Sequence, residues 1–158
     1  MSIVKVKEYF RQYGRENDVL EFEVSSATVA LAALALGCKE SEIAKTLSFR
    51  LKDSVILIVM AGDYKIDNSK FKGIFGEKAV MLKFYEVEPA IGHAVGGVCP
   101  FAINEGVDVY LDNSLKEHNF VYPACGSANS AIKLTLEELE NYSKGSWIDI
   151  TKKIEPII

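Results

Sequence analysis

The chain has 158 residues, of which 49% are hydrophobic and 25% are charged, proportions typical of one globular domain with a buried core. They exclude a disordered tail, a collagen-like fibre and a disulfide-stapled miniprotein. Acidic residues number 22 against 18 lysines and arginines, which gives a formal net charge of −4. This balance argues against a DNA partner and against broad contact with nucleic-acid backbones, although a local basic patch could still bind one end of an RNA.

The residue types that bind metals are few and widely spaced. Cys38, Cys99 and Cys125 form no C-x-x-C pair, and the chain has two histidines, His93 and His118. A structural zinc site needs about four soft ligands in tight spacing, so we expect no bound metal. An odd number of widely separated thiols is typical of a protein from a reducing compartment.

No segment has the pattern of a membrane anchor or an export signal. The longest apolar run spans 29–36, whereas a helix that crosses a bilayer needs about 20 residues. Residues 1–10 include two lysines and a glutamate and lack the apolar core of a signal peptide. We therefore expect a soluble, cytoplasmic protein without a membrane partner.

Apolar spacing and turn residues predict the elements of the first half of the chain. In order, these are a helix ending at Gly14, a strand over 19–24, an alanine-rich helix from the caps Ser25, Ser26 and Thr28 to Gly37, a short helix over 41–45, strands over 46–51 and 54–60, a helix over 67–75 and a strand over 79–82. The two consecutive strands should form a hairpin. The continuous apolar run 55–59 is typical of a central strand covered on both faces.

The second half begins with the segment 88–102, whose two prolines and three glycines predict an irregular loop. Strands are expected over 107–111, 119–123 and 131–134. Thr135 and Glu138 form a capping box that predicts a helix to Tyr142, and a last short strand is expected over 147–150. This mixture of elements indicates an α/β or α+β domain built on a mixed sheet.

Three places in the sequence could carry chemistry. Lys45 stands at the predicted junction of the short helix and the next strand, where a cation can be held over a cleft; a solvated lysine at a helix end is the plainer alternative. The loop Gly96-Gly97-Val98-Cys99-Pro100 could present backbone N–H groups to a carbonyl oxygen, or it could be a tight turn. The run Gly126-Ser127-Ala128-Asn129 could line a pocket or bind a phosphate, or it could be a plain loop.

The other titratable candidates have no visible partner in the sequence. His93 could act as a general base and Cys99 as a nucleophile, whereas His118 has the polar neighbours of a surface residue. Asp63 and Asp112 follow strand-like runs, and either a functional role or turn capping would account for them. The absence of Walker, H-E-x-x-H, G-x-S-x-G and G-x-G-x-x-G motifs argues against a P-loop nucleotidase, a zinc protease, an α/β-hydrolase and a dinucleotide enzyme.

Several segments, taken in order, resemble the blocks of one family. They are Glu42-Ile43-Ala44-Lys45-Thr46-Leu47, Val59-Met60-Ala61-Gly62-Asp63, Gly96-Gly97-Val98-Cys99-Pro100-Phe101, Val109-Tyr110-Leu111-Asp112-Asn113-Ser114-Leu115 and Gly126-Ser127. Together they resemble the YbaK/ProX family of aminoacyl-tRNA deacylases, which is related to the editing domain of bacterial prolyl-tRNA synthetase. The resemblance implies an α/β fold, a single compact domain over residues 1–158 with a mixed, strongly curved β-sheet and flanking helices.

The resemblance also implies a function: hydrolysis of the ester that joins a wrong amino acid to the terminal adenosine of tRNA, in trans, as in Cys-tRNA(Pro) or Ala-tRNA(Pro) deacylases, without a cofactor. Lys45 and Gly96 would be the catalytic residues. Substrate contacts are expected from Leu31, Thr46, Gly97, Val98, Pro100, Gly126 and Ser127, with Leu31, Ala30 and Leu34 of the alanine-rich helix as the pocket wall. The expected partners are the acceptor end of aminoacyl-tRNA and a synthetase or elongation factor that delivers it.

Ala102 departs from the family pattern, which often has glycine after the Pro-Phe pair. A β-carbon restricts the backbone there, so the path of the loop could differ. Three alternatives to the deacylase stay open from the sequence: a non-catalytic module that binds a tRNA acceptor end or a synthetase, a thiol-dependent enzyme that uses Cys99, and a small-molecule esterase.

Overall fold

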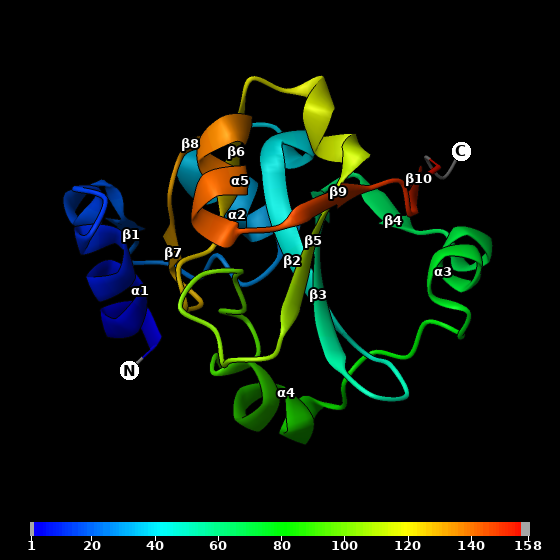
Figure 1. Cartoon of the computed structure of the whole chain (residues 1–158). Coiled ribbons are helices and arrows are strands. Elements are labelled where there is room, and N and C mark those ends of the chain that lie inside the picture. Colours follow the sequence, from blue (N-terminus) through cyan, green and yellow to red (C-terminus); the bar gives the residue numbers. More distant parts are fainter. Residues whose placement is uncertain (1, 156–158) are drawn as a thin grey trace.

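Two long paired strands form the centre of the molecule. The structure, a computed structural model, describes residues 2–155 (Figure 1). Strands β2 (Ile43–Arg50) and β3 (Val55–Ala61) pair antiparallel from Ala44 opposite Ala61 to Arg50 opposite Val55. This pairing confirms the predicted hairpin.

Four shorter strands extend this hairpin into a mixed sheet with the order β8-β6-β2-β3-β5-β9. They are β5 (Asp108–Asp112), β6 (Phe120–Pro123), β8 (Leu134–Thr135) and β9 (Ser146–Ile148). β6 pairs parallel with β2, β5 pairs parallel with β3, and β9 pairs parallel with β5. β8 pairs antiparallel with β6. The sheet is strongly curved (Figure 1), which confirms the mixed, curved sheet of the expected α/β fold.

Two small antiparallel pairs flank this sheet. β1 (Leu20–Glu21) pairs with β7 (Ser130–Ala131), and β4 (Tyr64–Ile66) pairs with β10 (Thr151–Lys153). Each of them joins segments that are far apart in the sequence. The first pair therefore ties the N-terminal part of the chain to the segment after β6, and the second ties the last described strand to the turn after β3.

In the described part of the chain, five α-helices surround the sheet (Figure 1). They are α1 (Ser2–Arg11), α2 (Val29–Leu36), α3 (Asn68–Phe75), α4 (Phe84–Ile91) and α5 (Leu136–Ser143). Short 3₁₀ turns precede β1, β2 and β6, at Glu16–Asp18, Glu40–Glu42 and Asn113–Glu117. Among residues 2–155, every helix is too short or too polar to cross a membrane.

Alternate residues of β3 belong to two different hydrophobic cores, because successive side chains of a strand point to opposite faces. Leu57 and Val59 pack with residues of α1, α4 and α5 in the larger core. Ile56 and Ile58 pack with Phe71 of α3 in the smaller one. Both faces of β3 are buried, as the continuous apolar run predicted.

The predicted short helix over 41–45 is wrong. The 3₁₀ turn ends at Glu42, and Lys45 is the third residue of β2. Residues 43–45 pair with β3 or β6 on either side, and this tertiary pairing outweighs the local preference of a short Ser-Glu segment. Lys45 consequently extends from a central strand rather than from a helix end.

The segment 88–102 is only partly the predicted loop, because α4 runs to Ile91 and includes Pro89. The proline removes one helical hydrogen bond, but the burial of Val87 and Ile91 in the larger core stabilises the helix around it. The predicted strand over 79–82 is also wrong, since it forms just an isolated bridge between Met81 and Phe49.

Three further strand predictions differ from the structure in their bounds. The strand predicted over 19–24 shortens to β1, and the strand over 131–134 divides into β7 and β8. The strand predicted over 147–150 corresponds to β9, which begins one residue earlier and ends at Ile148, and β10 begins only after this range. The capping box at Thr135 is confirmed: its side chain accepts a hydrogen bond from Glu138 N at 3.1 Å, and α5 follows.

Candidate functional site

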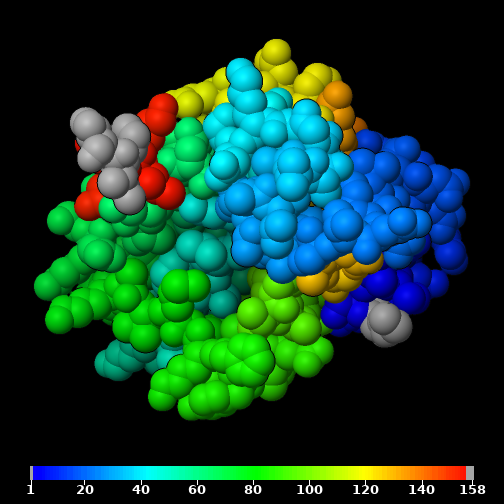
Figure 2. Space-filling view, turned by 180° about the vertical axis from the view of Figure 1, so that it is seen from behind, coloured from blue at the N-terminus to red at the C-terminus, as the bar shows by residue number. Residues whose placement is uncertain are grey.

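A cavity of about 440 Å³ opens between β2, α2, α4 and the loops at 95–98 and 124–131. Figure 2 shows the face of the molecule on which α2 (light blue) and α4 (green) lie. The cavity is lined mainly by small and apolar side chains, and Lys45 is the cationic residue of the lining. The lining residues with hydroxyl groups are Ser26, Thr28, Thr46, Ser48, Tyr122 and Ser130. The cavity volume is large enough for a small organic group.

Lys45 lies within the cavity lining, and its ammonium group donates a hydrogen bond to the carbonyl oxygen of Gly62 at 3.3 Å. The side chain is half-buried, and this burial lowers the pKa of Lys45, while the negative charge of Asp63 partly opposes the shift. Burial of a cation is costly unless a partner compensates it. One backbone carbonyl compensates it only in part, so the ammonium keeps donors available for an anionic or oxygen-bearing ligand.

Gly62 has no side chain because none would fit there. A β-carbon at this position would overlap the carbonyl oxygen of Glu40 and lie 2.7 Å from Cγ1 of Val29. The turn after β3 therefore packs directly against the start of β2 and α2. This close approach places the Gly62 carbonyl beside Lys45.

The loop around Gly96 borders the same cavity. Gly96 (φ +94°) and Val98 line it, whereas Gly97 and Pro100 lie outside the lining. The N–H of Gly97 donates to the carbonyl oxygen of Ala94 at 3.0 Å, so this amide is occupied within the loop. Within residues 2–155, no hydrogen bond uses the amides of Gly96 or Val98, so both remain available as donors to a ligand.

Gly97 brings the two glycine-containing loops into direct contact. A β-carbon on Gly97 would lie 2.6 Å from Ser127 N and 2.7 Å from the carbonyl carbon of Gly126. Gly126 and Ser127 do not line the cavity; they support the loop from behind, and the Ser127 hydroxyl lies 2.7 Å from that of Ser130. Ser130 is itself buried and faces the cavity, a residue that the sequence analysis missed.

The alanine-rich helix α2 contributes a different face from the one expected. Val29 and Ala32 line the cavity, together with the N-cap Thr28, whereas Leu31 is 41% exposed and lies outside the lining. Leu34 is 81% exposed. Because the helix is apolar nearly all round, its sequence has no periodicity that would distinguish the cavity face from the solvent face.

Thr46 is the neighbour of Lys45 on β2 and also lines the cavity. Its hydroxyl oxygen is buried and has no hydrogen-bond partner within residues 2–155. Buried polar atoms are normally paired, so an unpaired one at a cavity wall is available to a bound ligand.

His93 and Cys99 form a buried pair away from the cavity. His93 Nε2 donates to the carbonyl oxygen of Phe101 at 2.7 Å and lies 3.5 Å from the Cys99 sulfur. Both side chains are fully buried and neither lines the cavity. Burial raises the pKa of the Cys99 thiol to about 12 and lowers that of His93, so Cys99 is a neutral thiol in the core.

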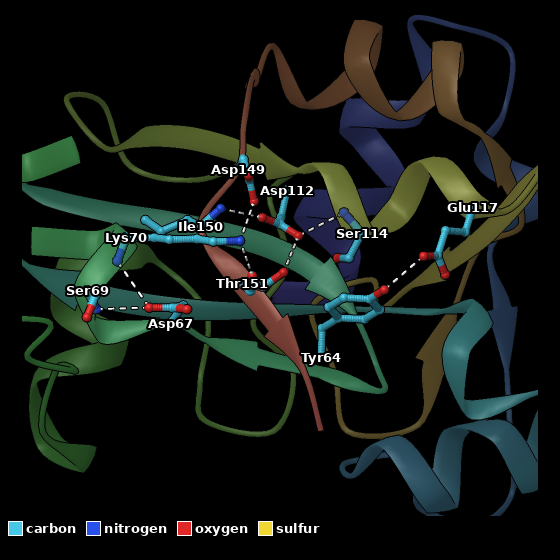
Figure 3. A network of polar contacts seen from close by, with 10 residues as sticks. All are labelled: Tyr64, Asp67, Ser69, Lys70, Asp112, Ser114, Glu117, Asp149, Ile150 and Thr151. Atoms are coloured by element: carbon cyan, nitrogen blue, oxygen red, sulfur yellow. Dashed lines mark hydrogen bonds and ion pairs between the residues drawn. The ribbon is translucent and has the colours of Figure 1, made fainter. Parts of the chain in front are cut away.

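Asp112 acts as a structural carboxylate (Figure 3). It is buried, and its oxygens accept hydrogen bonds from Ser114 N at 2.8 Å, Ile150 N at 2.9 Å and the Thr151 hydroxyl at 2.6 Å. It thus caps the 3₁₀ turn after β5 and holds the start of β10. In the part of the chain that the structure describes, no three His, Cys, Asp or Glu side chains gather to form a metal site.

Ala102 adopts φ +53°, in the left-handed region that glycine usually occupies. An alanine at this position thus takes a backbone conformation that glycine adopts without strain. A left-handed alanine costs about 1–2 kcal/mol, and the neighbouring Phe101 is fully buried in the larger core.

Comparison with known proteins finds relatives in sequence and in fold. Residues 23–142 match the family model of the aminoacyl-tRNA editing domain. The uncharacterized protein YwhH of Bacillus subtilis is 55% identical over 157 residues, which are 98% of this chain and all of that protein. The proline–tRNA ligase of Bacillus cytotoxicus is 28% identical over 93 residues, which are 58% of this chain but 16% of the ligase.

Solved structures resemble the whole chain. The crystal structure of a proposed trans-editing enzyme for prolyl-tRNA synthetase superposes with a TM-score of 0.87 at 26% identity, covering 96% of this chain and 97% of that one. The hypothetical protein APE2540 superposes with a TM-score of 0.83 at 29% identity, covering 94% and 99%.

Proposed function

Because this chain belongs to the aminoacyl-tRNA editing domain family, we propose that it is a trans-editing hydrolase that deacylates mischarged tRNA. It would cleave the ester between a wrong amino acid and the terminal adenosine, with Cys-tRNA(Pro) or Ala-tRNA(Pro) as the substrate type. The observation that carries the proposal is the half-buried Lys45 inside a cavity that the Gly96 loop also borders. Aminoacyl-tRNA is a cytoplasmic substrate, and we place the reaction there.

The chemistry needs few groups, because an aminoacyl ester is already activated. Lys45 would hold a phosphate or ribose oxygen of the terminal nucleotide by its charge and so fix the position of the ester. The amides of Gly96 and Val98 would donate to the carbonyl oxygen as negative charge develops on it. The unpaired Thr46 hydroxyl would bind a polar group of the aminoacyl moiety. Water attacks the carbonyl carbon, and the ribose hydroxyl leaves as the ester bond breaks.

The acidic net charge bears on how tRNA is held. A chain with a formal charge of −4 makes few phosphate contacts and would hold the acceptor end alone. A synthetase or an elongation factor is therefore the expected source of delivered substrate. The affinity for tRNA should fall only gently with salt concentration, since few counterions are released.

The test is single-turnover deacylation of a panel of mischarged tRNAs with the wild type and Lys45→Ala. Lys52, an exposed residue of the β2–β3 turn, offers Lys52→Ala as a charge-matched control. We expect fast hydrolysis of one or a few small aminoacyl groups by the wild type and the control, and loss of it in Lys45→Ala. No hydrolysis across the panel, with acceptor-end binding intact, would instead indicate a recognition module.

A further inference from the structure

The mouth of the cavity carries large apolar side chains that the fold leaves in solvent. Phe84, the first residue of α4, is 79% exposed, and Met81 and Val95 are 52% and 51% exposed. All three also belong to the cavity lining. An exposed phenylalanine contributes little to folding, so its position at the entrance of a site points to contact with a ligand.

We propose that Phe84 is a stacking platform for the terminal adenine base of the bound tRNA. This inference rests on the proposed function, in which the ester lies in the cavity with Lys45. The base is joined to the same ribose that carries the ester, so a few bonds separate it from the reacting carbonyl. When the aminoacyl group is inside the cavity, the base must therefore lie at the mouth, where Phe84 offers an exposed aromatic ring. Aromatic rings of this kind bind unpaired bases by stacking.

Charge at the mouth agrees with stacking rather than with phosphate binding. Glu86 lies 2.5 Å from the guanidinium group of Arg50, and it also accepts a hydrogen bond from Lys83 N at 2.9 Å. The ammonium of Lys83 lies 6.0 Å from the ring centre of Tyr85, beside Phe84. Glu86 is thus paired with a cation, and among the cavity-lining residues that the structure describes Lys45 is the one cation, too few to hold several phosphates. Stacking supplies affinity that an acidic chain cannot obtain from phosphate contacts.

A protein partner fits this position less well than an unpaired base. A protein seated on Phe84, Met81 and Val95 would cover the mouth through which the substrate enters. A nucleotide that is covalently joined to the group in the cavity occupies the same place without obstructing it. The exposed side chains of Phe84, Met81 and Val95 are therefore continuous with the cavity, and they contact the adenine base, which must remain outside it.

The experiment uses an acceptor-stem RNA whose terminal adenine is replaced by 2-aminopurine, a base whose fluorescence is quenched by stacking. The full chain is titrated into this RNA as the wild type, Phe84→Ala, Phe84→Trp and Tyr85→Ala. Tyr85 is the matched control, because it is 70% exposed on the same helix but lies outside the cavity lining. Thermal unfolding of each variant checks that the fold is intact, as expected for residues this exposed.

We expect quenching with the wild type, Phe84→Trp and Tyr85→Ala, and its loss with Phe84→Ala. Since one stacked base contributes about 5-fold or more in affinity, Phe84→Ala should raise KM for mischarged tRNA by at least that factor. Quenching and KM equal to the wild type in Phe84→Ala would overturn the inference, even if deacylation itself is found. Equal losses in Phe84→Ala and Tyr85→Ala would also overturn it, because they would indicate a broad docking face.

The same experiment separates this inference from the proposed function. If the wild type hydrolyses no mischarged tRNA, the proposed function fails, whereas the fluorescence titration still reports whether the base stacks on Phe84. If hydrolysis occurs and depends on Lys45 but not on Phe84, the function stands and the platform is wrong.

Discussion

The ammonium group of Lys45 donates a hydrogen bond to the carbonyl oxygen of Gly62 at 3.3 Å, across the end of the β2–β3 hairpin. One residue supplies the charge of the cavity, and the other supplies the backbone acceptor that fixes its direction. Only glycine allows the chain to approach Glu40 and Val29 closely enough for this contact. The candidate catalytic group is therefore positioned by the rigid centre of the sheet rather than by a loop.

Replacing Lys45 should separate activity from stability. Lys45→Met removes the charge and keeps an apolar stem of similar size, so we expect deacylation to fall about 10²-fold, or about 2.7 kcal/mol of transition-state stabilisation. The free energy of unfolding should not decrease, because the half-buried cation is desolvated in the folded state. Single-turnover kinetics and urea unfolding measure the two quantities. A large loss of stability would contradict this account of Lys45.

The lowered pKa of Lys45 also predicts opposite pH trends for activity and stability. As the pH rises, Lys45 loses its proton at a lower pH than an exposed lysine does. If deacylation needs the ammonium, its rate, corrected for spontaneous ester hydrolysis, should begin to fall at that lower pH. Between the folded-state pKa and the unfolded value of about 10.4, the unfolded chain holds more protons at this site. The contribution of Lys45 to the unfolding free energy therefore rises with pH in that window, and its cost to stability is fully present below it. Lys45→Met should lack both trends.

Gly97→Ala should displace the loop that borders the cavity. The added β-carbon would lie 2.6 Å from Ser127 N, against backbone that cannot move freely. We expect a loss of about 1–3 kcal/mol in the free energy of unfolding, together with weaker deacylation. Gly73→Ala is the control, because its β-carbon meets no atom within 4 Å and it lies inside α3, where alanine should add about 0.5–1 kcal/mol. Unchanged stability and activity in Gly97→Ala would refute the close contact of the two loops.

Val29→Ala should widen the range of amino acids that are accepted. Val29 lines the cavity, so its truncation enlarges the space by two methyl groups, and one methylene is worth about 1–3 kcal/mol in selectivity. Leu31→Ala is the paired variant from the same helix, and its side chain lies outside the cavity lining. Deacylation rates over a set of aminoacyl groups of increasing size compare the two. If Leu31→Ala changed the profile and Val29→Ala did not, α2 would present its other face to the substrate.

Asp112→Asn should destabilise the protein although Asp112 is outside the cavity. The buried carboxylate accepts three hydrogen bonds, and an amide offers one oxygen in place of two. We expect a loss of about 2–4 kcal/mol on chemical unfolding. Asp149→Asn removes an exposed partner of Lys70 and should cost at most about 1 kcal/mol. Similar, small effects of the two substitutions would contradict the structural role of Asp112.

Thiol chemistry should not be needed for activity. Burial raises the pKa of Cys99 to about 12, and the sulfur is fully buried, so at neutral pH it is protonated and inaccessible. We expect iodoacetamide to modify Cys99 only after unfolding, as mass spectrometry would detect, and Cys99→Ser to keep deacylation. Inactivation of the folded wild type by alkylation, with Cys99→Ser resistant, would restore the thiol-dependent alternative.

The sequence by itself determined the main elements and the family. Hydrophobic period, caps and turn residues indicate the hairpin, α3 and α5, because these signals are local and act within a few residues. Ordered blocks such as Gly96–Phe101 carry the resemblance to the editing domains, since loops that bind ligands need particular residue types. The candidate residues Lys45, Thr46, Gly96 and Val98 come from these blocks, and they line one cavity.

Only the tertiary structure decided which residues share the cavity and which support it. Sheet pairing with β3 and β6 turns residues 43–45 into a strand, although their local sequence favours a helix. The uniformly apolar α2 receives its cavity face, with Val29 and Ala32, from packing rather than from periodicity. Gly97 and Ser127 meet through backbone contact, and Asp112 meets Thr151, because long-range packing brings them together. Such contacts depend on the positions of distant segments, which no local pattern in the sequence encodes.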